Sequence, residues 1–221
     1  NSYEYDKNHN RETARKLNSY VRNVCDQAIH EGLIMRNPTY KATITGANPS
    51  KSEDLKFISH TEYVKLKHYL EQKDTTSSLV LLMALVTGGR FSEIANMQRD
   101  DFYLGDNKIH LPGTKTETSD RIISIDTNTL NKVKRFIEKK PANINGYVFT
   151  VNGHVISNTA INKVLKKACV HLGIKSITIN ALRHTHASVL IHNGYSLHYI
   201  SKRLGHTSTL VTQSAVSYTH L

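Results

Sequence analysis

Long apolar runs and cysteines are both scarce in this sequence of 221 residues. No apolar run reaches the roughly 18 residues that a membrane-spanning helix needs, and we recognise no signal peptide, so we expect a soluble globular protein without a membrane partner. The two cysteines, Cys25 and Cys169, lie far apart and form neither a disulfide framework nor a cluster of metal ligands. A reducing compartment, and hence the cytoplasm, is the simpler expectation.

Acidic residues are also few relative to basic ones. The 29 lysines and arginines outnumber the 18 aspartates and glutamates, which gives a formal charge of +11. Such an excess favours a polyanionic partner such as nucleic acid, although a basic surface without a ligand explains the charge alone equally well. The 38% hydrophobic content is enough to form the core of one large or two small domains.

Residues 1–40 predict one amphipathic helix. Between Glu12 and Leu33 apolar residues recur at helical spacing, and a glycine supplies the end of the helix. The polar stretch 41–56 contains glycine and proline and has no clear periodicity, so we interpret it as an interdomain linker. The main domain then covers residues 57–221.

A buried helix is predicted at the centre of the main domain. Ser59 and Glu62 have the spacing of a capping box, which predicts that a helix begins there. The segment SLVLLMALVTGGR at 78–90 is apolar on every side, so it predicts a central helix that its two glycines terminate. A shorter helix follows, through Met97.

Three short runs next predict a small antiparallel sheet. DFYL, KIHLP and RIISI have the composition of strands and are separated by Gly105 to Asn107 and by the polar segment GTKTETSD. Helical periodicity then returns at 129–139, 159–172, 178–192 and 197–204. We therefore predict a mainly α fold with a small three-stranded antiparallel β-sheet, in the α+β class.

Four polar residues stand where local structure favours another kind of residue. They are Arg90 after the buried helix, Lys115 at a strand end, Arg183 on an apolar helical stripe and His206 behind a glycine. A buried guanidinium without an anion costs on the order of several kcal/mol. Arg183 therefore needs either a carboxylate partner or an anionic ligand.

Two arginines, a lysine and a histidine suit a phosphodiester. Arginine forks two donors onto the non-bridging phosphate oxygens, while lysine offers a proton. These donors gain most when charge builds up around the phosphorus in the transition state. The set lacks a nucleophile, and Tyr218 in the run AVSYTHL, twelve positions after His206, is the candidate for that role.

The order and spacing of these motifs resemble the tyrosine recombinase or phage integrase family. The resemblance rests on TGGRFSEIANM, GTKTETSDR, ALRHTHASVL and LGH followed by a late tyrosine, and it covers nearly the whole chain from Phe57 onward. It implies the tyrosine recombinase catalytic domain fold for residues 57–221. The earlier segment, with VCDQAIHEGLIMRNP, resembles the C-terminal part of that family's helical core-binding domain, which would occupy residues 1–40.

The resemblance implies a role for each residue of the set. Arg90 and Arg183 would clamp the scissile phosphate, and His206 would hydrogen-bond or position it. Lys115 would protonate the leaving 5′ oxygen. Tyr218 would attack the phosphorus and form a 3′-phosphotyrosyl bond, which keeps the energy of the DNA link. Neither a metal ion nor another cofactor is therefore implied.

One position departs from the family pattern. The family usually has a histidine three residues before its second arginine, and here that residue is Asn180. An amide can donate a hydrogen bond but cannot take the tyrosine proton. This departure keeps open an alternative to the enzyme, a catalytically weakened recombinase relic that acts as a DNA-binding protein. Glu93, one turn after Arg90, is expected to orient that arginine.

The resemblance implies a site-specific DNA recombinase, a tyrosine-type strand transferase that integrates or excises a mobile element such as a phage. Its partners would be double-stranded DNA recombination sites in the bacterial cytoplasm, where it would assemble as a homo-tetramer with accessory DNA-bending proteins. Lys163, Lys166 and Lys167 are candidate DNA contacts, although such lysine groups more often form a solvated face.

Ordinary structural roles compete with several of these assignments. Arg183 could pair with a buried carboxylate, Lys115 could be a simple hairpin lysine, and Tyr218 could belong to a frayed tail. His184 and His186 could bind a metal ion in a metal-dependent phosphodiesterase. Residues two apart on a helix do not share a face, however, and no third ligand has a suitable spacing.

Overall fold

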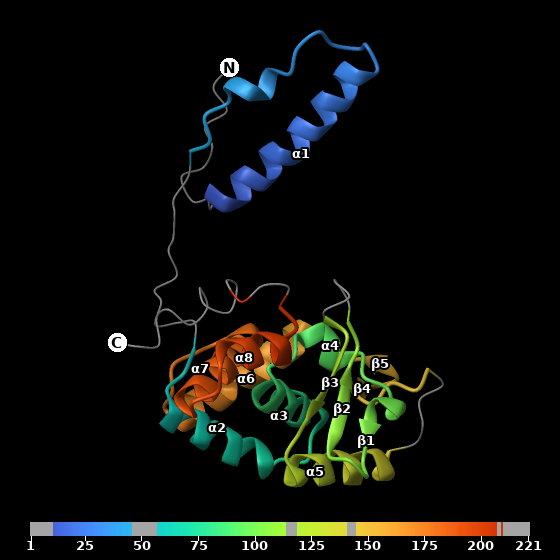
Figure 1. Ribbon diagram of the computed structural model, residues 1–221, viewed down its shortest axis with the longest axis vertical. Coiled ribbons are helices and arrows are strands. Elements are labelled where there is room, and N and C mark those ends of the chain that lie inside the picture. Colours follow the sequence, from blue (N-terminus) through green and yellow to red (C-terminus); the bar gives the residue numbers. More distant parts are fainter. Residues whose placement is uncertain (1–10, 46–56, 114–118, 141–144, 207–208, 210–221) are drawn as a thin grey trace. The chain divides into compact units, whose positions relative to one another are not determined.

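The computed structural model contains two compact units, Asn1–Lys51 and Ser52–Leu221 (Figure 1). Within these units the structure describes residues 11–45, 57–113, 119–140, 145–206 and 209. None of the helices in these ranges is long and apolar enough to cross a membrane.

The first unit consists of one long helix and a short 3₁₀ turn. The periodicity predicted from Glu12 onward forms α1 (Arg11–His30), and the chain then turns into η1 (Pro38–Lys41). Asn37 caps η1 by accepting a backbone N–H of the turn at 2.8 Å, and its amide donates to Asp26 of α1 at 2.6 Å. Asn37 therefore ties the turn to the helix.

The core of the second unit surrounds α3 (Thr76–Thr87). Every residue of this helix from Ser78 onward is buried, as its continuous apolar run predicts. The neighbours that pack against α3 are α2 (His60–Glu71), α6 (Asn158–Leu172) and α7 (Ile179–His192). The two ends of α3 are thereby held in fixed places.

Caps fix the starts of the helices that surround this core. Ser59 and Glu62 form the predicted capping box at the start of α2, with backbone N–H to side-chain oxygen distances of 2.8 and 3.2 Å. The helices predicted after the sheet are also present, α5 (Thr127–Lys139) and α8 (Leu197–Leu204) as well as α6 and α7. Each lies close to its predicted bounds.

The predicted three-stranded antiparallel sheet is confirmed. Its strands β1 (Phe102–Tyr103), β2 (Lys108–Leu111) and β3 (Arg121–Ser124) lie in that order, and Ile109 of β2 is paired with Ile123 of β3. Both isoleucines are buried, so this face of the sheet joins the core. The fold is mainly α with one small sheet, as predicted.

A second sheet is absent from the sequence-based prediction. It is a hairpin of β4 (Thr150–Val151) and β5 (His154–Val155). Asn152 and Gly153 connect the strands with φ angles of 51° and 81°. Two successive positive φ angles are the requirement of a tight hairpin turn, for which Asn-Gly is the strongest local signal.

Gly88 brings the end of α3 close to α7 and α8. It terminates α3 with a φ angle of 67°, and a Cβ atom there would lie 2.8 Å from the His186 ring and 2.6 Å from the Leu204 side chain. The short helix α4 (Phe91–Ala95) follows directly. Within the second unit, α4 and α5 lie at opposite ends of β2 and β3 (Figure 1).

Candidate active site

Arg90 is held by a wholly buried carboxylate. It precedes α4, and its backbone N–H and Nη1 donate to the two carboxylate oxygens of Glu93 at 2.9 and 2.7 Å. The Glu93 side chain has no exposed surface, whereas 31% of the Arg90 side chain is exposed. The expected orienting role of Glu93 agrees with this geometry, which leaves further donors of the Arg90 guanidinium available for a ligand.

Burial acts to raise the pKa of Glu93, because it penalises a charged carboxylate. Attraction to Arg121 and the hydrogen bonds from Arg90 outweigh this effect, so the pKa of Glu93 lies below its ordinary value. Glu93 is therefore an anion at neutral pH, and it lies between two arginines.

Arg121, the first residue of β3, is a site residue that the sequence analysis missed. Its Nη2 donates to Glu93 at 3.1 Å, its Nε to the Arg203 carbonyl at 2.6 Å and its Nη1 to the Ser119 carbonyl at 2.6 Å. Burial, reinforced by repulsion from Arg90 and Arg203, lowers the pKa of Arg121 despite the attraction of Glu93. The only sequence signal for it is its position at the end of the GTKTETSDR motif.

Arg183 is half-buried and has no carboxylate partner among the described residues. Its Nη1 donates to the Gly88 carbonyl at 2.8 Å and its Nη2 to the Leu204 carbonyl at 2.7 Å. No acidic side chain among the described residues lies within ion-pair distance of it. Burial and then repulsion from Arg90 lower the pKa of Arg183 to about 9, so it stays mostly protonated at neutral pH.

These contacts address the question that the sequence raises about Arg183. The interpretation as a partner of a buried carboxylate finds no support in the described part of the chain. The guanidinium is oriented by neutral carbonyl oxygens, and Glu93 acts on it only from beyond ion-pair distance, so its charge is not directly paired. The positive charge of the Arg183 guanidinium is therefore available to an anionic ligand.

His206 lies next to these arginines at the end of α8. Gly205 terminates the helix with a φ angle of 69°, and the His206 backbone N–H donates to the Ser201 carbonyl at 3.0 Å. Burial, followed by repulsion from Arg183 and Arg90, lowers the pKa of His206 to about 4. His206 is therefore a neutral imidazole at pH 7, with one ring nitrogen able to donate and the other able to accept.

Three of the predicted site residues thus come together at the C-terminal end of α3. Arg90, Arg183 and His206 lie near enough for the charges of both arginines to act on the histidine. With Arg121 added, three cations surround the single buried carboxylate of Glu93. The local excess of positive charge and the forked donors suit a tetrahedral oxyanion such as a phosphate.

The other predicted residues are not part of this group. Asn180 is exposed in the first turn of α7, one turn before Arg183. Three exposed lysines lie on α6, at Lys163, Lys166 and Lys167. Lys115 and Tyr218 lie outside the residues that the structure describes.

His186 is placed differently from a metal ligand. It is buried, its Nδ1 lies 3.1 Å from the Leu85 carbonyl, and its Nε2 accepts from Arg203 Nε at 3.1 Å. The second contact makes Nε2 the acceptor, so Nδ1 carries the proton. Burial and repulsion from Arg203 lower the pKa of His186 to about 3. Because both ring nitrogens are engaged, the idea that His184 and His186 form a metal pair is wrong.

The sequence analysis also missed a group of hydrogen bonds around His110, at the ends of the segment that connects β2 and β3. His110 Nδ1 lies 2.6 Å from Asp101, and its Nε2 lies 2.7 Å from Asp120. Asp120 also accepts the Gly113 N–H at 3.1 Å. Burial acts to lower the pKa of His110, but the hydrogen bonds to Asp101 and Asp120 outweigh it, so the pKa is raised. The described ends of the connection that carries Lys115 are therefore fastened together.

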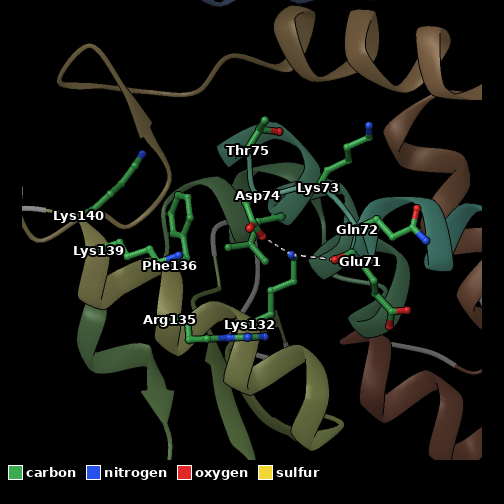
Figure 2. Close-up of a pocket in the computed structure, with 11 residues that line it drawn as sticks. Glu71, Gln72, Lys73, Asp74, Thr75, Lys132, Arg135, Phe136, Lys139 and Lys140 are labelled. Carbon is green, nitrogen blue, oxygen red and sulfur yellow. Dashed lines mark hydrogen bonds and ion pairs between the residues drawn. The ribbon is translucent and has the colours of Figure 1, made fainter.

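A second basic region lies at the N-terminal end of α3. A cavity of about 380 Å³ there lies between the α2–α3 link and α5 (Figure 2). Lys132 Nζ donates to Asp74 at 2.6 Å and to the Glu71 carbonyl at 2.9 Å, and Lys140 Nζ donates to the Thr150 carbonyl at 2.9 Å. These lysines therefore tie neighbouring elements of the second unit together.

The family to which the chain belongs follows from comparison with known proteins. Residues 56–221 match the Phage integrase family. The chain therefore belongs to the phage integrase family, and this confirms the resemblance inferred from its motifs.

Individual relatives agree with this assignment. The tyrosine recombinase XerD of Lacticaseibacillus casei is 28% identical over 207 residues, which cover 87% of this chain and 67% of the relative. The integrase of Staphylococcus phage L54a is 29% identical over 219 residues and is matched over 78% of this chain and 61% of its own length. The chain thus spans about two thirds or less of these curated relatives.

A solved structure supports the fold independently of close sequence similarity. The Tn1549 transposon integrase, in complex with a circular intermediate DNA, has a TM-score of 0.75 at 15% identity. The alignment covers 94% of this chain and 75% of that chain. At this level of identity the likeness shows a shared tyrosine recombinase fold.

Proposed function

We propose that the chain is the catalytic part of a site-specific DNA recombinase, with the end of a core-binding domain before it. It cleaves and rejoins DNA strands through a 3′-phosphotyrosyl intermediate and so integrates or excises a mobile element. The names of its relatives support this proposal, because they are tyrosine recombinases and integrases. The Tn1549 integrase is bound to a circular intermediate DNA, which supports DNA as the substrate; we propose that it is double-stranded.

The observation that carries the proposal is that Arg183 forms no ion pair with a carboxylate in the described part of the chain. Its two terminal nitrogens donate to the main-chain carbonyls of Gly88 and Leu204, and Arg90 lies nearby with a partly exposed side chain. Two arginines with free donors on one side can each fork onto the non-bridging oxygens of one phosphate. As phosphorus becomes pentacoordinate, these donors stabilise the added charge more than they stabilise the ground state.

The neutral state of His206 adds a donor without adding charge. With a pKa of about 4, the imidazole is uncharged at pH 7 and can donate one N–H to a phosphate oxygen. It can equally accept a proton through the other nitrogen. His206 is thus suited to position the phosphate beside the two arginines.

The nucleophile and the acid of this mechanism lie outside the described residues. Tyr218 attacks the phosphorus, Lys115 protonates the departing 5′ oxygen, and a second 5′ hydroxyl later reverses the reaction. In each step one P–O bond forms as another breaks: the bond to the tyrosine oxygen replaces the bond to the 5′ oxygen, and the second step reverses this exchange. Asn180 can donate a hydrogen bond to the phosphate but cannot accept the tyrosine proton, so a water or another group takes that proton.

The family resemblance supports further expectations about the assembly. The protein binds recombination sites in bacterial DNA as a homo-tetramer, with accessory DNA-bending proteins. The exposed lysines of α6, which are Lys163, Lys166 and Lys167, contact the phosphate backbone. Such contacts give DNA affinity that falls as salt rises, because bound counterions are released.

A nicked suicide substrate tests the proposal. After cleavage such DNA loses the short fragment that would reverse the reaction, so an enzyme of this kind accumulates as a covalent protein–DNA adduct. We expect the adduct to form equally with and without a chelator. Binding of the DNA without any adduct would instead identify the recombinase relic, which the amide at Asn180 favours. Loss of cleavage on adding the chelator would identify metal-dependent chemistry.

A further inference from the structure

We infer that Arg121 is a positioning residue of the recombination reaction, which holds Arg90 and Arg183 in the arrangement that a phosphate requires. The inference rests on the proposed function. It concerns a residue that neither the motif analysis nor the family roles assign to the site. Arg121 acts through its neighbours and does not touch the substrate.

The contacts of Arg121 connect three separate segments. Its Nη2 donates to Glu93 in α4, its Nε to the Arg203 carbonyl at the end of α8 and its Nη1 to the Ser119 carbonyl before β3. Only 8% of its side chain is exposed. Three of its five N–H donors are engaged, and the remaining two lie on a side chain that is almost inaccessible to solvent, so we place Arg121 behind the phosphate site.

The first link runs through Glu93 to Arg90. Glu93 Oε2 receives both the Arg121 Nη2 and the Arg90 backbone N–H, and Oε1 receives Arg90 Nη1. Two arginines share the neutralisation of the buried Glu93 carboxylate. If one is removed, the other must neutralise that charge alone. Without Arg121, Glu93 therefore draws the Arg90 guanidinium inward, away from a ligand.

The second link runs through the end of α8 to Arg183. Arg121 binds the carbonyl of Arg203, and Arg183 binds the carbonyl of the next residue, Leu204, at 2.7 Å. Carbonyls in the last turn of a helix lack partners within the helix. The two arginines therefore fix successive free carbonyls of one turn, and His206 follows directly after it.

Arg99 provides a matched control for this role. It is also a half-buried arginine that donates to main-chain carbonyls, at Ile137 and Lys140 with distances of 3.2 and 2.8 Å. Its partners are at the C-terminal end of α5, away from Arg90 and Arg183. If cleavage slows because the fold is destabilised, variants of both arginines should be slow. If it slows because the site is misplaced, only variants of Arg121 should be slow.

The test compares Arg121→Gln, Arg121→Lys and Arg99→Gln with the parent chain. DNA affinity and the single-turnover rate on the nicked suicide substrate are measured for each. We expect Arg121→Gln to bind DNA within about three-fold of the parent and to cleave about 30-fold to 100-fold more slowly, the scale of a small misplacement of reacting groups. Arg121→Lys should recover part of the rate, and Arg99→Gln should cleave like the parent.

Three results would overturn the inference. Unchanged cleavage by Arg121→Gln would show that the contacts are incidental. A loss of DNA affinity in step with the rate would place Arg121 on the substrate. An equal loss of rate in Arg99→Gln would show general destabilisation. If Arg121→Gln does not fold, the same comparison is made with Arg121→Lys, for which full parental activity overturns the inference.

Binding of orthovanadate separates this inference from the proposed function. This ion is a tetrahedral oxyanion like phosphate, and its vanadium can accept a fifth oxygen to reach the trigonal bipyramidal geometry of a phosphoryl transition state. Its binding to Arg90 and Arg183 requires no cleavage. We expect Arg121→Gln to weaken it about ten-fold, as expected when preorganised donors are displaced. A parent that forms no adduct contradicts the proposed function, and unchanged vanadate binding by Arg121→Gln then contradicts the positioning role.

Discussion

Arg183 is a half-buried cation that neutral carbonyl oxygens orient. The Gly88 and Leu204 carbonyls occupy one donor on each terminal nitrogen, so the remaining donors can serve a phosphate. Lysine has a single ammonium group and cannot hold both carbonyls and fork onto two oxygens. We expect Arg183→Lys to keep DNA affinity within a few-fold while its single-turnover cleavage falls by about 100-fold or more. A variant that cleaves like the parent would show that Arg183 is structural.

Asn180 sets the pH dependence expected of the reaction. Asn180 does not titrate, and His206 with a pKa of about 4 stays neutral from pH 5.5 upward, so neither residue changes its protonation state near neutral pH in the parent. In Asn180→His, the exposed position receives an imidazole that accepts protons above its pKa of about 6.5. Cleavage by the variant should be faster and should rise as pH rises through this range. A rate profile parallel to that of the parent would show that the site is built around the amide.

At the scale of elements, the end of α3 depends on a glycine. Gly88 has a φ angle of 67°, and a Cβ atom would meet the His186 ring at 2.8 Å, which two hydrogen bonds hold in place. Gly173 at the end of α6 has a similar φ angle of 64° with no atom near its missing Cβ, so it measures the backbone strain alone. We expect Gly173→Ala to lower the free energy of unfolding by about 1 kcal/mol. Gly88→Ala should lower it by about 1–3 kcal/mol more, because of the clash.

Urea unfolding of the two alanine variants measures both effects. If both variants lose the same free energy of unfolding, the clash at Gly88 would be relieved by small shifts of α3, α7 and α8. Gly88→Ala should also slow cleavage, because the Gly88 carbonyl orients Arg183. Gly173→Ala should leave the cleavage rate unchanged.

The elements also show what the sequence could and could not predict. The continuous apolar run of α3 and the capping box at Ser59 are local patterns, and both were interpreted correctly. The β4–β5 hairpin was missed although Asn152 and Gly153 signal its turn, because strands of two residues are too short to show alternation. Helix bounds shifted only slightly, since periodicity does not define caps.

The site residues also divide into those with a local signal in the sequence and those without one. Arg90 and Arg183 were found because each conflicts with an apolar pattern in its own segment. Arg121 was missed because nothing in its segment distinguishes it from an exposed residue at the start of a strand. Its burial comes from partners 28 and 82 positions away. Contacts over such separations follow from the packing of the whole unit and leave no local signal.

At the scale of the whole molecule, the central claim is that cleavage joins DNA to Tyr218. A phenol with an ordinary pKa of about 10 is a poor nucleophile at pH 7, and it becomes effective where Arg90 and Arg183 favour its phenolate. The decisive measurement is peptide mapping of the adduct formed on the nicked suicide substrate, together with the Tyr218→Phe variant. We expect the DNA on Tyr218, and the variant should bind DNA normally while forming no adduct. Adduct on another tyrosine, such as the exposed Tyr195 and Tyr199 at the start of α8, would contradict the claim, and so would adduct that survives in Tyr218→Phe.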